Sequence, residues 1–405
     1  MSRPTMRRVV LVHSSDEMYG ADRIVLQITD ALRAEPRLEL EVWLPIDVQH
    51  GATPLCAELE ARGVTVRHMA LPMLRRSLLT PSGLVAIARR CRALRRSLVR
   101  HRADLVYCAT SACAPVVAVA KSAGVASIVL HAQEMWSGPE QRLLRLMVRG
   151  SSLRIAISSA VDRSMGLHDP RPVIVPNAVP VPAVVGPRLS PDGRPDGLRF
   201  VMASRWTPRK GYATLLQAWS LAGCPGHLTI LGGPAPAGRS VDVPHLVSTL
   251  VPDVHTVSVV GEVPDIAPYI AESDVVLLPS DLPEGFGLVV VEAFAQGRPA
   301  IASRSGGTVD VITHGVDGWL FTPGDPVSLA AVLSSLTPAA VAEAGSRSSR
   351  AAARHTPDRF QRTIRSLILD ELGMAQAAED DVVDRADQLD QAELLDQAEL
   401  LSEAS

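Results

Sequence analysis

The stretch VVLLPSDLPEGFGLVVVEAFAQG, residues 275–297, contains in order an apolar strand, a glycine-containing loop and a helix. Val275–Leu278 is a short apolar run, and the helical segment after the loop stops at Gly297, an ordinary C-terminal position for glycine. Continuous apolar strands that alternate with helices are typical of a parallel sheet covered on both faces. This stretch therefore predicts a doubly wound α/β domain.

The same alternation runs through the rest of the chain and is interrupted once, by the proline-rich stretch Pro180–Pro195. After it, we expect further strands at Leu198–Ala203, Leu228–Leu231, Thr256–Val260 and Pro299–Ser303, with helices at Tyr212–Leu221 and Val327–Leu336. Before it, we expect strands at Arg7–Ser14, Leu38–Leu44, Val64–Met69, Asp104–Ala109, Ala126–His131, Leu153–Ile157 and Val173–Val175. Two such domains in tandem predict a ligand cleft between the carboxyl ends of their strands.

The chain is therefore divided into an N-terminal Rossmann-like domain (1–185), a C-terminal Rossmann-like domain (186–358), a final helix (359–372) and a tail (373–405). The final helix has one apolar face, on which it is expected to pack back on the N-terminal domain; that face comprises Phe360, Ile364, Leu367 and Ile368. The tail repeats DQAELL and is acidic, which favours a solvated extension.

From its composition we expect the protein to be cytoplasmic. Of the 405 residues 47% are apolar, yet no apolar run approaches the roughly 18 residues of a membrane-spanning helix. Val9–Val12 is too short for a signal peptide. The five cysteines form no CxxC pair, which suits a reducing compartment and argues against a zinc site or a disulfide framework.

Charge is distributed unevenly along the chain. Residues 1–185 contain 24 basic and 15 acidic residues, 186–372 contain 15 and 18, and 373–405 contain 1 and 10. Such asymmetry bears on the partners of a protein.

The loop of residues 283–287 carries the strongest signal for a binding site. Its glycines let the backbone approach a ligand, and the free amides at the helix start, near Gly287 and Leu288, favour a phosphate group. Glu284 in the loop and Glu292 in the helix can accept hydrogen bonds from sugar or ribose hydroxyls. The alternative is that neither carboxylate binds a ligand: Glu284 would be a partner of the helix dipole and Glu292 a surface charge.

A second signal is the basic loop SRWTPRKG at residues 204–211, between another strand and helix. Arg205 and Lys210 are placed to stabilise the negative charge of a departing diphosphate, and Lys210 is one of only two lysines in the chain. The alternative is an exposed basic loop. Gly20 after the first strand and His131 after another are weaker signals, because single glycines and histidines are common at such turns.

In combination, these motifs resemble the retaining family 4 glycosyltransferases of the two-domain GT-B fold. The resemblance rests on the E-x7-E pattern of Glu284 and Glu292, the Arg205/Lys210 pair, Asn177 in VPNAVP, Ser305-Gly306-Gly307 and Asp317-Gly318, and it covers the chain to about residue 372. Two positions depart from it: Tyr19-Gly20 stands for the common double glycine, and Val309-Asp310 for proline–glutamate.

The resemblance implies a role for each candidate residue. Glu284 would hold hydroxyls of the donor sugar, Glu292 the ribose, and Arg205 and Lys210 the diphosphate, helped by the backbone at Gly20, Gly287 and Leu288. His131 would lie beside the transferred sugar, and Gly261, Glu262 and Val263 near the base. It also implies catalysis without a metal, and the sequence contains no D-x-D motif to hold a divalent cation.

The implied activity is retaining transfer of a sugar from a nucleoside diphosphate carrier to an acceptor, in cell-envelope or exopolysaccharide glycan or glycolipid synthesis. No nucleic-acid partner is expected. Two alternatives remain open, a sugar-nucleotide epimerase and a non-catalytic nucleotide-sugar-binding module. A nicotinamide dehydrogenase is disfavoured because no G-x-G-x-x-G follows any expected strand.

Nine arginines lie within Leu74–Arg102, a segment that also has an apolar face at helical spacing, and Gln141–Arg149 is similar in style. Basic amphipathic helices bind anionic membrane surfaces. We therefore expect peripheral docking on the inner face of the membrane and a glycan or lipid-linked acceptor. The alternative is that the apolar faces pack on the sheet and the arginines are merely solvated.

Overall fold

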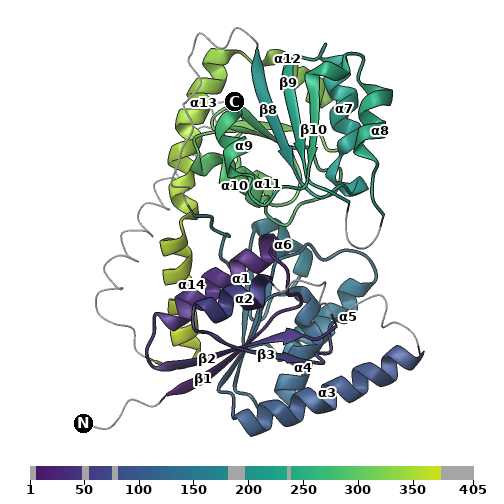
Figure 1. The fold of residues 1–405 in the computed structure, drawn as a ribbon. Helices are drawn as coiled ribbons and strands as arrows, with labels where there is room; N and C mark the ends of the chain where they lie inside the picture. The colour runs from purple at the N-terminus through teal and green to yellow at the C-terminus, as the bar shows by residue number, and fades with distance from the viewer. Residues whose placement is uncertain (1–5, 48–53, 75–80, 181–196, 235–238, 375–405) are drawn as a thin grey trace.

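The computed structural model describes residues 6–47, 54–74, 81–180, 197–234 and 239–374. The expected interdomain linker and nearly all of the acidic tail lie outside these ranges. Two α/β domains, each built on its own parallel sheet, lie one above the other (Figure 1). The predicted pair of doubly wound domains is therefore confirmed.

The N-terminal sheet has seven parallel strands in the order β3-β2-β1-β4-β5-β6-β7. The strands are β1 (Arg7–Val12), β2 (Leu38–Pro45), β3 (Thr65–Met69), β4 (Leu105–Cys108), β5 (Ser127–Ala132), β6 (Leu153–Ala156) and β7 (Val173–Ile174). The strand order reverses direction between β1 and β4, and in such sheets the crevice at this switch point binds ligands.

Helices cover both faces of this sheet. They are α1 (Gly20–Arg33), α2 (Pro54–Ala61), α3 (Pro81–His101), α4 (Ala114–Ser122), α5 (Glu140–Met147) and α6 (Ser159–Met165). On one face, Ile24, Ile28 and Leu32 of α1 enter the core, and on the other Leu94 and Leu98 of α3 do so. Alternate residues of β1 point to these two cores, which explains why the whole strand is apolar.

The C-terminal sheet has six parallel strands in the order β10-β9-β8-β11-β12-β13, with its switch point between β8 and β11. The strands are β8 (Leu198–Ala203), β9 (Gly226–Leu231), β10 (Val257–Gly261), β11 (Val275–Leu278), β12 (Ala300–Ser303) and β13 (Gly318–Phe321). The helices are α7 (Tyr212–Leu221), α8 (Val243–Leu250), α9 (Ala267–Glu272), α10 (Leu288–Ala295), α11 (Thr308–Val311), α12 (Pro326–Ser335) and α13 (Pro338–Ala351). Residues 275–297, with which the sequence analysis began, form β11, the following loop and α10.

The last helix, α14 (Pro357–Glu371), crosses back to the N-terminal domain. Figure 1 shows α13 and α14 running along one side of the molecule, past both domains. Phe360, Ile364 and Ile368 are buried in the same cluster as α1, whereas Leu367 is only partly buried. This apolar face fastens the end of the described chain to the domain in which the chain begins.

Within the described residues, no single helix is long and apolar enough to cross a membrane. One pair, Pro326–Ser335 with Pro338–Glu371, meets the length and composition criterion only when taken together, across a bend of 100°.

Candidate active site

The predicted site residues meet at a cavity of about 660 Å³ between the two domains. It lies at the carboxyl ends of the strands, and its volume falls in the range of small-molecule sites. Nine predicted residues line it: Gly20, Arg205, Lys210, Glu262, Val263, Glu284, Gly287, Leu288 and Glu292.

Glu284 is buried and held by cations at the wall of this cavity. Its Oε1 accepts hydrogen bonds from Lys210 Nζ, at 2.7 Å, and from the hydroxyl of Ser280. Burial alone would raise the pKa of Glu284, but the charge and hydrogen bond of Lys210, the Ser280 hydroxyl and the Arg209 guanidinium outweigh burial and lower it. Glu284 is therefore ionised at neutral pH.

A glycine loop fixes the backbone of Glu284. The amide of Gly307 donates to the Glu284 carbonyl at 2.9 Å, and Gly306 pairs with Glu284 as an isolated bridge. Gly306 has φ +69°, and a Cβ there would clash with the Glu284 backbone. The Ser305-Gly306-Gly307 motif thus fixes the backbone position of Glu284. Gly287, with φ +98°, turns the chain into α10.

Glu292 lies one turn into α10 and pairs across the cleft. Its Oε1 accepts from Arg23 Nη1 of α1 at 3.2 Å. Burial raises the pKa of Glu292, while Arg23 lowers it and Asp265 raises it further. This carboxylate is thus an interdomain contact in addition to a cavity-lining group.

Arg205 is exposed and faces the opposite domain. Its guanidinium carbon lies 3.9 Å from the centroid of the Tyr19 ring, a close cation–π stack. The neighbouring Arg209 donates to the Pro283 carbonyl at 3.0 Å, which ties the basic loop to the Glu284 loop. Lys210 and Arg205 thus reach the cavity from one loop with different partners.

His131 is not at the cavity surface, contrary to the expectation that it lies beside the transferred sugar. The side chain is fully buried, Gln133 lies between it and the cavity, and Gln133 Nε2 is 3.2 Å from His131 Nε2. Burial lowers the pKa of His131 to about 3. The imidazole is therefore neutral, with Nε2 accepting from the Gln133 amide and Nδ1 facing Tyr107 Oη at 2.8 Å. β5 ends at Ala132, one residue beyond the expected strand Ala126–His131, so His131 lies within the strand.

Gly261 also stays behind the cavity wall, where it ends β10 and its carbonyl accepts from the Gly232 amide at 2.7 Å. Glu262 and Val263, which follow it, do line the cavity. Sequence reasoning assigned no role to Tyr19, Arg23 and Gln133, which line the cavity as well. The position of Arg23, three residues after Gly20, could be read from the sequence. Its pairing with Glu292 could not, because the two residues are 269 positions apart.

Short polar contacts close the cleft beside the cavity. Ser158 Oγ donates to the Gly285 carbonyl at 2.7 Å. Asp310 accepts from both the amide and the hydroxyl of Ser159, at 2.7 and 2.6 Å. Asp310 is one of the two positions at which the sequence departs from the family pattern, and here it holds the start of α6 against the C-terminal domain.

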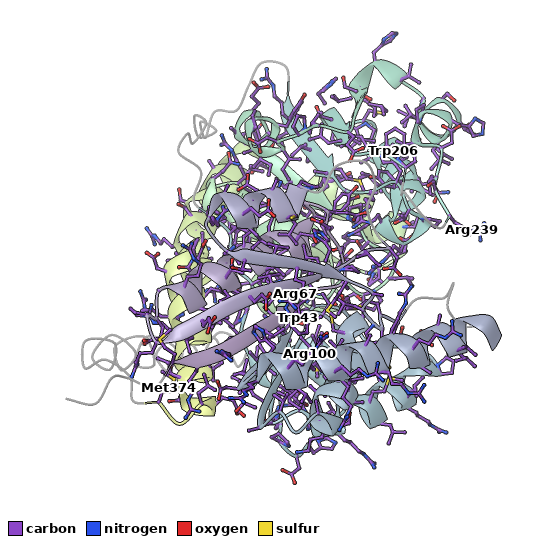
Figure 2. The ribbon with its side chains drawn as sticks, turned by 60° about the horizontal axis from the view of Figure 1, so that its bottom comes forward. Trp43, Arg67, Arg100, Trp206, Arg239 and Met374 are labelled. Carbon is purple, nitrogen blue, oxygen red and sulfur yellow. The ribbon has the colours of Figure 1, made fainter. Side chains whose placement is uncertain are left out.

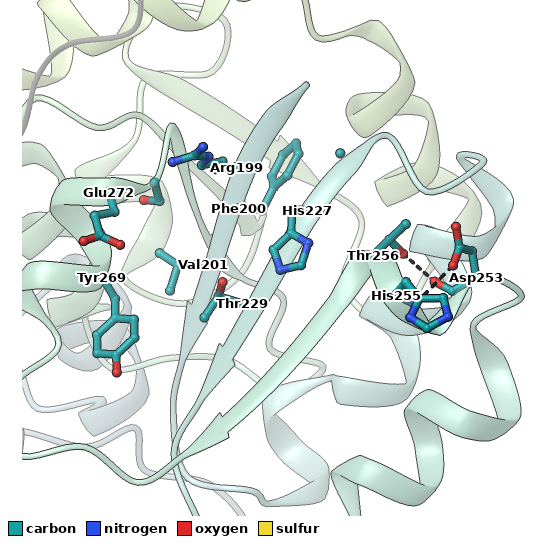
Figure 3. A pocket seen from close by; sticks show the side chains of 12 residues that line it. Arg199, Phe200, Val201, His227, Thr229, Asp253, His255, Thr256, Tyr269 and Glu272 are labelled. Atoms are coloured by element: carbon teal, nitrogen blue, oxygen red, sulfur yellow. Dashed lines mark hydrogen bonds between the residues drawn. The ribbon is translucent and has the colours of Figure 1, made fainter. Parts of the chain in front are cut away.

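A second hollow, of about 580 Å³, lies elsewhere in the C-terminal domain (Figure 3). Its lining comes from the amino ends of the strands: Arg199 of β8, His227 of β9, and Asp253 and Glu272 just before β10 and β11. This is the sheet edge opposite the interdomain cavity. Ligands of doubly wound sheets bind at the carboxyl edge, so we do not assign the donor to this hollow.

Asp16, Cys56 and His68 bring potential metal-ligating atoms within 4.8 Å of one another, a cluster that no spacing in the sequence revealed. Asp16 already accepts from the Cys56 amide at 2.8 Å and from His68 Nε2 at 2.9 Å. Burial, with Glu60 nearby, raises the pKa of the Cys56 thiol to about 11, so the thiol keeps its proton. The Asp16 carboxylate is thus hydrogen-bonded within the cluster, and these bonds hold the loop between β1 and α1 in place.

Comparison with known proteins agrees with this architecture. Residues 197–337 match the family described as Glycosyl transferases group 1. This part of the C-terminal domain is thus similar to the group 1 glycosyl transferases, and the chain as a whole has the GT-B fold.

Curated relatives match parts of the chain. The amylovoran biosynthesis glycosyltransferase AmsK of Erwinia amylovora is 32% identical over 151 residues, which are 34% of this chain and 35% of the relative. An exopolysaccharide phosphotransferase of Streptomyces coelicolor is 34% identical over 182 residues, 44% of this chain and 18% of the relative. The matches thus span about a third or less of these relatives.

Solved structures match nearly the whole chain. Anabaena Alr3699/HepE in complex with UDP-glucose superposes with a TM-score of 0.73 at 22% identity, covering 90% of this chain and 99% of that one. The lipopolysaccharide outer core galactosyltransferase WaaB superposes with a TM-score of 0.70 at 17% identity, covering 90% and 100%. At these identities the likeness establishes the fold.

Proposed function

We propose that the protein is a retaining glycosyltransferase that moves a sugar from a nucleoside diphosphate carrier to an acceptor in polysaccharide or glycolipid synthesis. The observation that carries the proposal is the composition of the interdomain cavity. Two carboxylates, Glu284 and Glu292, and two cations, Arg205 and Lys210, surround the start of α10. Hydroxyl groups and a diphosphate are the ligands that suit these groups.

The comparisons support the same donor class. HepE is described in complexes with UDP and with UDP-glucose, and AmsK is named for amylovoran biosynthesis. In this chain the diphosphate would lie against Lys210, Arg205 and the backbone amides at Gly287 and Leu288.

The proposed reaction relies on positioning and charge. The acceptor hydroxyl attacks from the same face as the leaving group, and the departing phosphate takes its proton, while Lys210 and Arg205 stabilise the developing negative charge. Glu284 holds sugar hydroxyls and is not the nucleophile. Its ion pair with Lys210 keeps both side chains in place beside the proposed donor position.

The alternatives make different predictions. A binding module would hold the donor without releasing nucleotide, and an epimerase would change the sugar without transferring it. Incubation with a panel of UDP-, GDP- and dTDP-sugars separates them. We expect slow hydrolysis of at least one donor to nucleoside diphosphate and free sugar. Tight binding of a donor without any hydrolysis would favour the module, and a donor converted only to an isomeric nucleotide sugar would favour the epimerase.

Activity is expected to persist in excess EDTA, because the proposed site neutralises the diphosphate with Arg205 and Lys210 in place of a divalent cation. The measurement is the rate of nucleoside diphosphate release before and after chelation, with added Mg²⁺ and Mn²⁺ as controls. A rate that falls with EDTA and returns with either cation would contradict a metal-independent site.

The acceptor is proposed to be lipid-linked, with the N-terminal domain docked on an anionic membrane surface. Figures 1 and 2 show α3 along the outer edge of that domain, away from the C-terminal domain. Leu94 and Leu98 pack into the core of the N-terminal domain, so the C-terminal half of α3 has a structural role, as the alternative reading expected. The other half is exposed: Leu84 and Val85 are 59% and 54% accessible.

Exposed cations accompany these apolar side chains. Arg89, Arg92 and Arg96 lie exposed on α3, and Leu143 and Leu146 of α5 are 45% and 59% accessible. Arg90 is instead engaged, donating to Asp47 at 2.6 Å. Arg75 and Arg76, also part of the predicted basic segment, lie outside the described residues. Shallow apolar burial plus attraction to anionic headgroups is the mode that suits this surface.

Removing residues 373–405 is expected to tighten binding to anionic vesicles, more so at low salt. The tail contains 1 basic and 10 acidic residues, so it competes with lipid for the basic domain at high effective concentration. Sedimentation with anionic and neutral vesicles is the measurement. Arg92→Ala with Arg96→Ala should weaken binding, while the matched pair Arg347→Ala with Arg350→Ala on α13 should not. Equal binding to both vesicle types by all variants would mean that α3 only covers the N-terminal sheet, and a soluble acceptor would become the better proposal.

A further inference from the structure

Tyr19 lies at the start of α1, at the position where the sequence departs from a double glycine. Its ring stacks on the Arg205 guanidinium at 3.9 Å. Tyr19 belongs to the loop after β1 of the N-terminal domain, and Arg205 to the loop after β8 of the C-terminal domain. The contact therefore exists only while the two domains face each other closely.

This stack is the kind of contact that leaves Arg205 available to a ligand. A guanidinium that stacks face-on keeps its N–H donors in the plane, where they match the oxygens of a phosphate. Within the described part of the chain, no carboxylate pairs with Arg205. The other cavity cations differ, because Lys210 is bound to Glu284 and Arg23 to Glu292.

Tyr19 itself is anchored by its backbone. Its amide donates to Asp22 Oδ2 at 2.9 Å, and Asp22 is buried and held by His13 Nε2 at 2.8 Å and by the Ser15 hydroxyl. Gly20 beside it packs against α10, since a Cβ there would lie 2.7 Å from Leu288 Cδ1 and the Leu288 side chain would have to shift. The backbone of Tyr19 is thus held in place by contacts that do not depend on the ring.

We propose that Tyr19 is a positioning residue for donor binding: it holds the Arg205 guanidinium with its donors turned to the diphosphate, and does so only in the closed cleft. This rests on the proposed function, in which Arg205 binds the diphosphate. Preorganising a flexible side chain before binding improves affinity by lowering the cost of ordering it. The opposite arrangement is a ring that blocks the diphosphate position, and it predicts the opposite sign for the loss of the ring.

The test is calorimetric titration with UDP, GDP and dTDP, followed by use of whichever binds the wild-type protein most tightly. Tyr19→Ala should weaken that nucleotide about fivefold, which corresponds to about 1 kcal/mol for a cation–π contact. Tyr19→Phe should restore binding to within about twofold, because the ring face is kept. Tyr269→Ala, the same change at a tyrosine that lines the second hollow and not the interdomain cavity, should leave affinity unchanged.

A double-mutant cycle separates this inference from the proposed function. If Tyr19 acts through Arg205, then Tyr19→Ala should add nothing in an Arg205→Ala background. Wild-type nucleotide affinity in Arg205→Ala, or no binding of any of the three nucleotides, would overturn the diphosphate assignment and this inference with it. Loss of affinity in Arg205→Ala but not in Tyr19→Ala would overturn the role of Tyr19 alone. Tighter binding by Tyr19→Ala would show that the ring blocks the site.

Discussion

Lys210→Ala is expected to lower the rate of transfer by about a hundredfold or more, and Arg205→Ala to have an effect of the same order. That is the loss seen when one preorganised group that stabilises developing charge is removed. Lys210 lies 2.7 Å from Glu284 and Arg205 stacks on Tyr19, so both are held near the proposed leaving group. The measurement is nucleoside diphosphate release under saturating donor.

The control for this prediction is Lys121→Ala. Lys121 is the only other lysine of the chain and lies exposed at the end of α4, away from the cavity. Its removal should leave the rate unchanged. Because Lys210→Ala leaves the Glu284 carboxylate without its closest cation, thermal unfolding must be compared as well. A folded Arg205→Ala/Lys210→Ala double mutant with wild-type rates would disprove the diphosphate assignment.

Glu284→Gln is expected to lower kcat by about a hundredfold while leaving the affinity for bare nucleoside diphosphate almost unchanged. Glu292→Gln is expected to weaken the bare nucleotide about tenfold, the scale of a hydrogen bond to a charged group. The reason is position: Glu284 lies in the loop at the end of β11, whereas Glu292 lies within α10. Calorimetry with the nucleotide and steady-state kinetics with the donor separate the two effects.

Arg23→Ala is the matched control for Glu292. Glu292 is paired with Arg23, so a purely structural role for this carboxylate would make Arg23→Ala weaken nucleotide binding as much as Glu292→Gln does. If Glu292 binds the ribose, Arg23→Ala should not reproduce that loss. Loss of nucleotide binding in Glu284→Gln but not in Glu292→Gln would mean that the two roles are reversed.

Most of the fold was predictable because its signals are local. The strand–loop–helix period of residues 275–297 recurs along the chain, and apolar strands alternating with helices leave few architectures open. Some elements were not predicted. β13 (Gly318–Phe321) and α9 (Ala267–Glu272) are four and six residues long, too short for periodicity to distinguish them from loops. The 14-residue α13 (Pro338–Ala351) was missed as well.

The residues of the candidate site were predictable where a recognisable motif directly follows the end of a strand. Glu284, Lys210 and Glu292 line the cavity because each follows a strand of the same sheet. His131 was placed at the strand end by its motif, but the direction of its side chain was not predictable: its ring is fully buried against Tyr107 and Phe360, and Gln133 lines the cavity instead. Contacts between domains, such as Tyr19 with Arg205, depend on how the domains face each other, and no local pattern contains that information.

The most direct test of the central claim is proton NMR of the wild-type protein with the nucleotide sugar that it binds most tightly, recorded from the first minutes. We predict that nucleoside diphosphate accumulates together with free sugar of the same anomeric configuration as the donor, ahead of mutarotation. Release of the opposite anomer would contradict a retaining reaction. Donor that stays intact although it is bound would contradict a transferase of any kind.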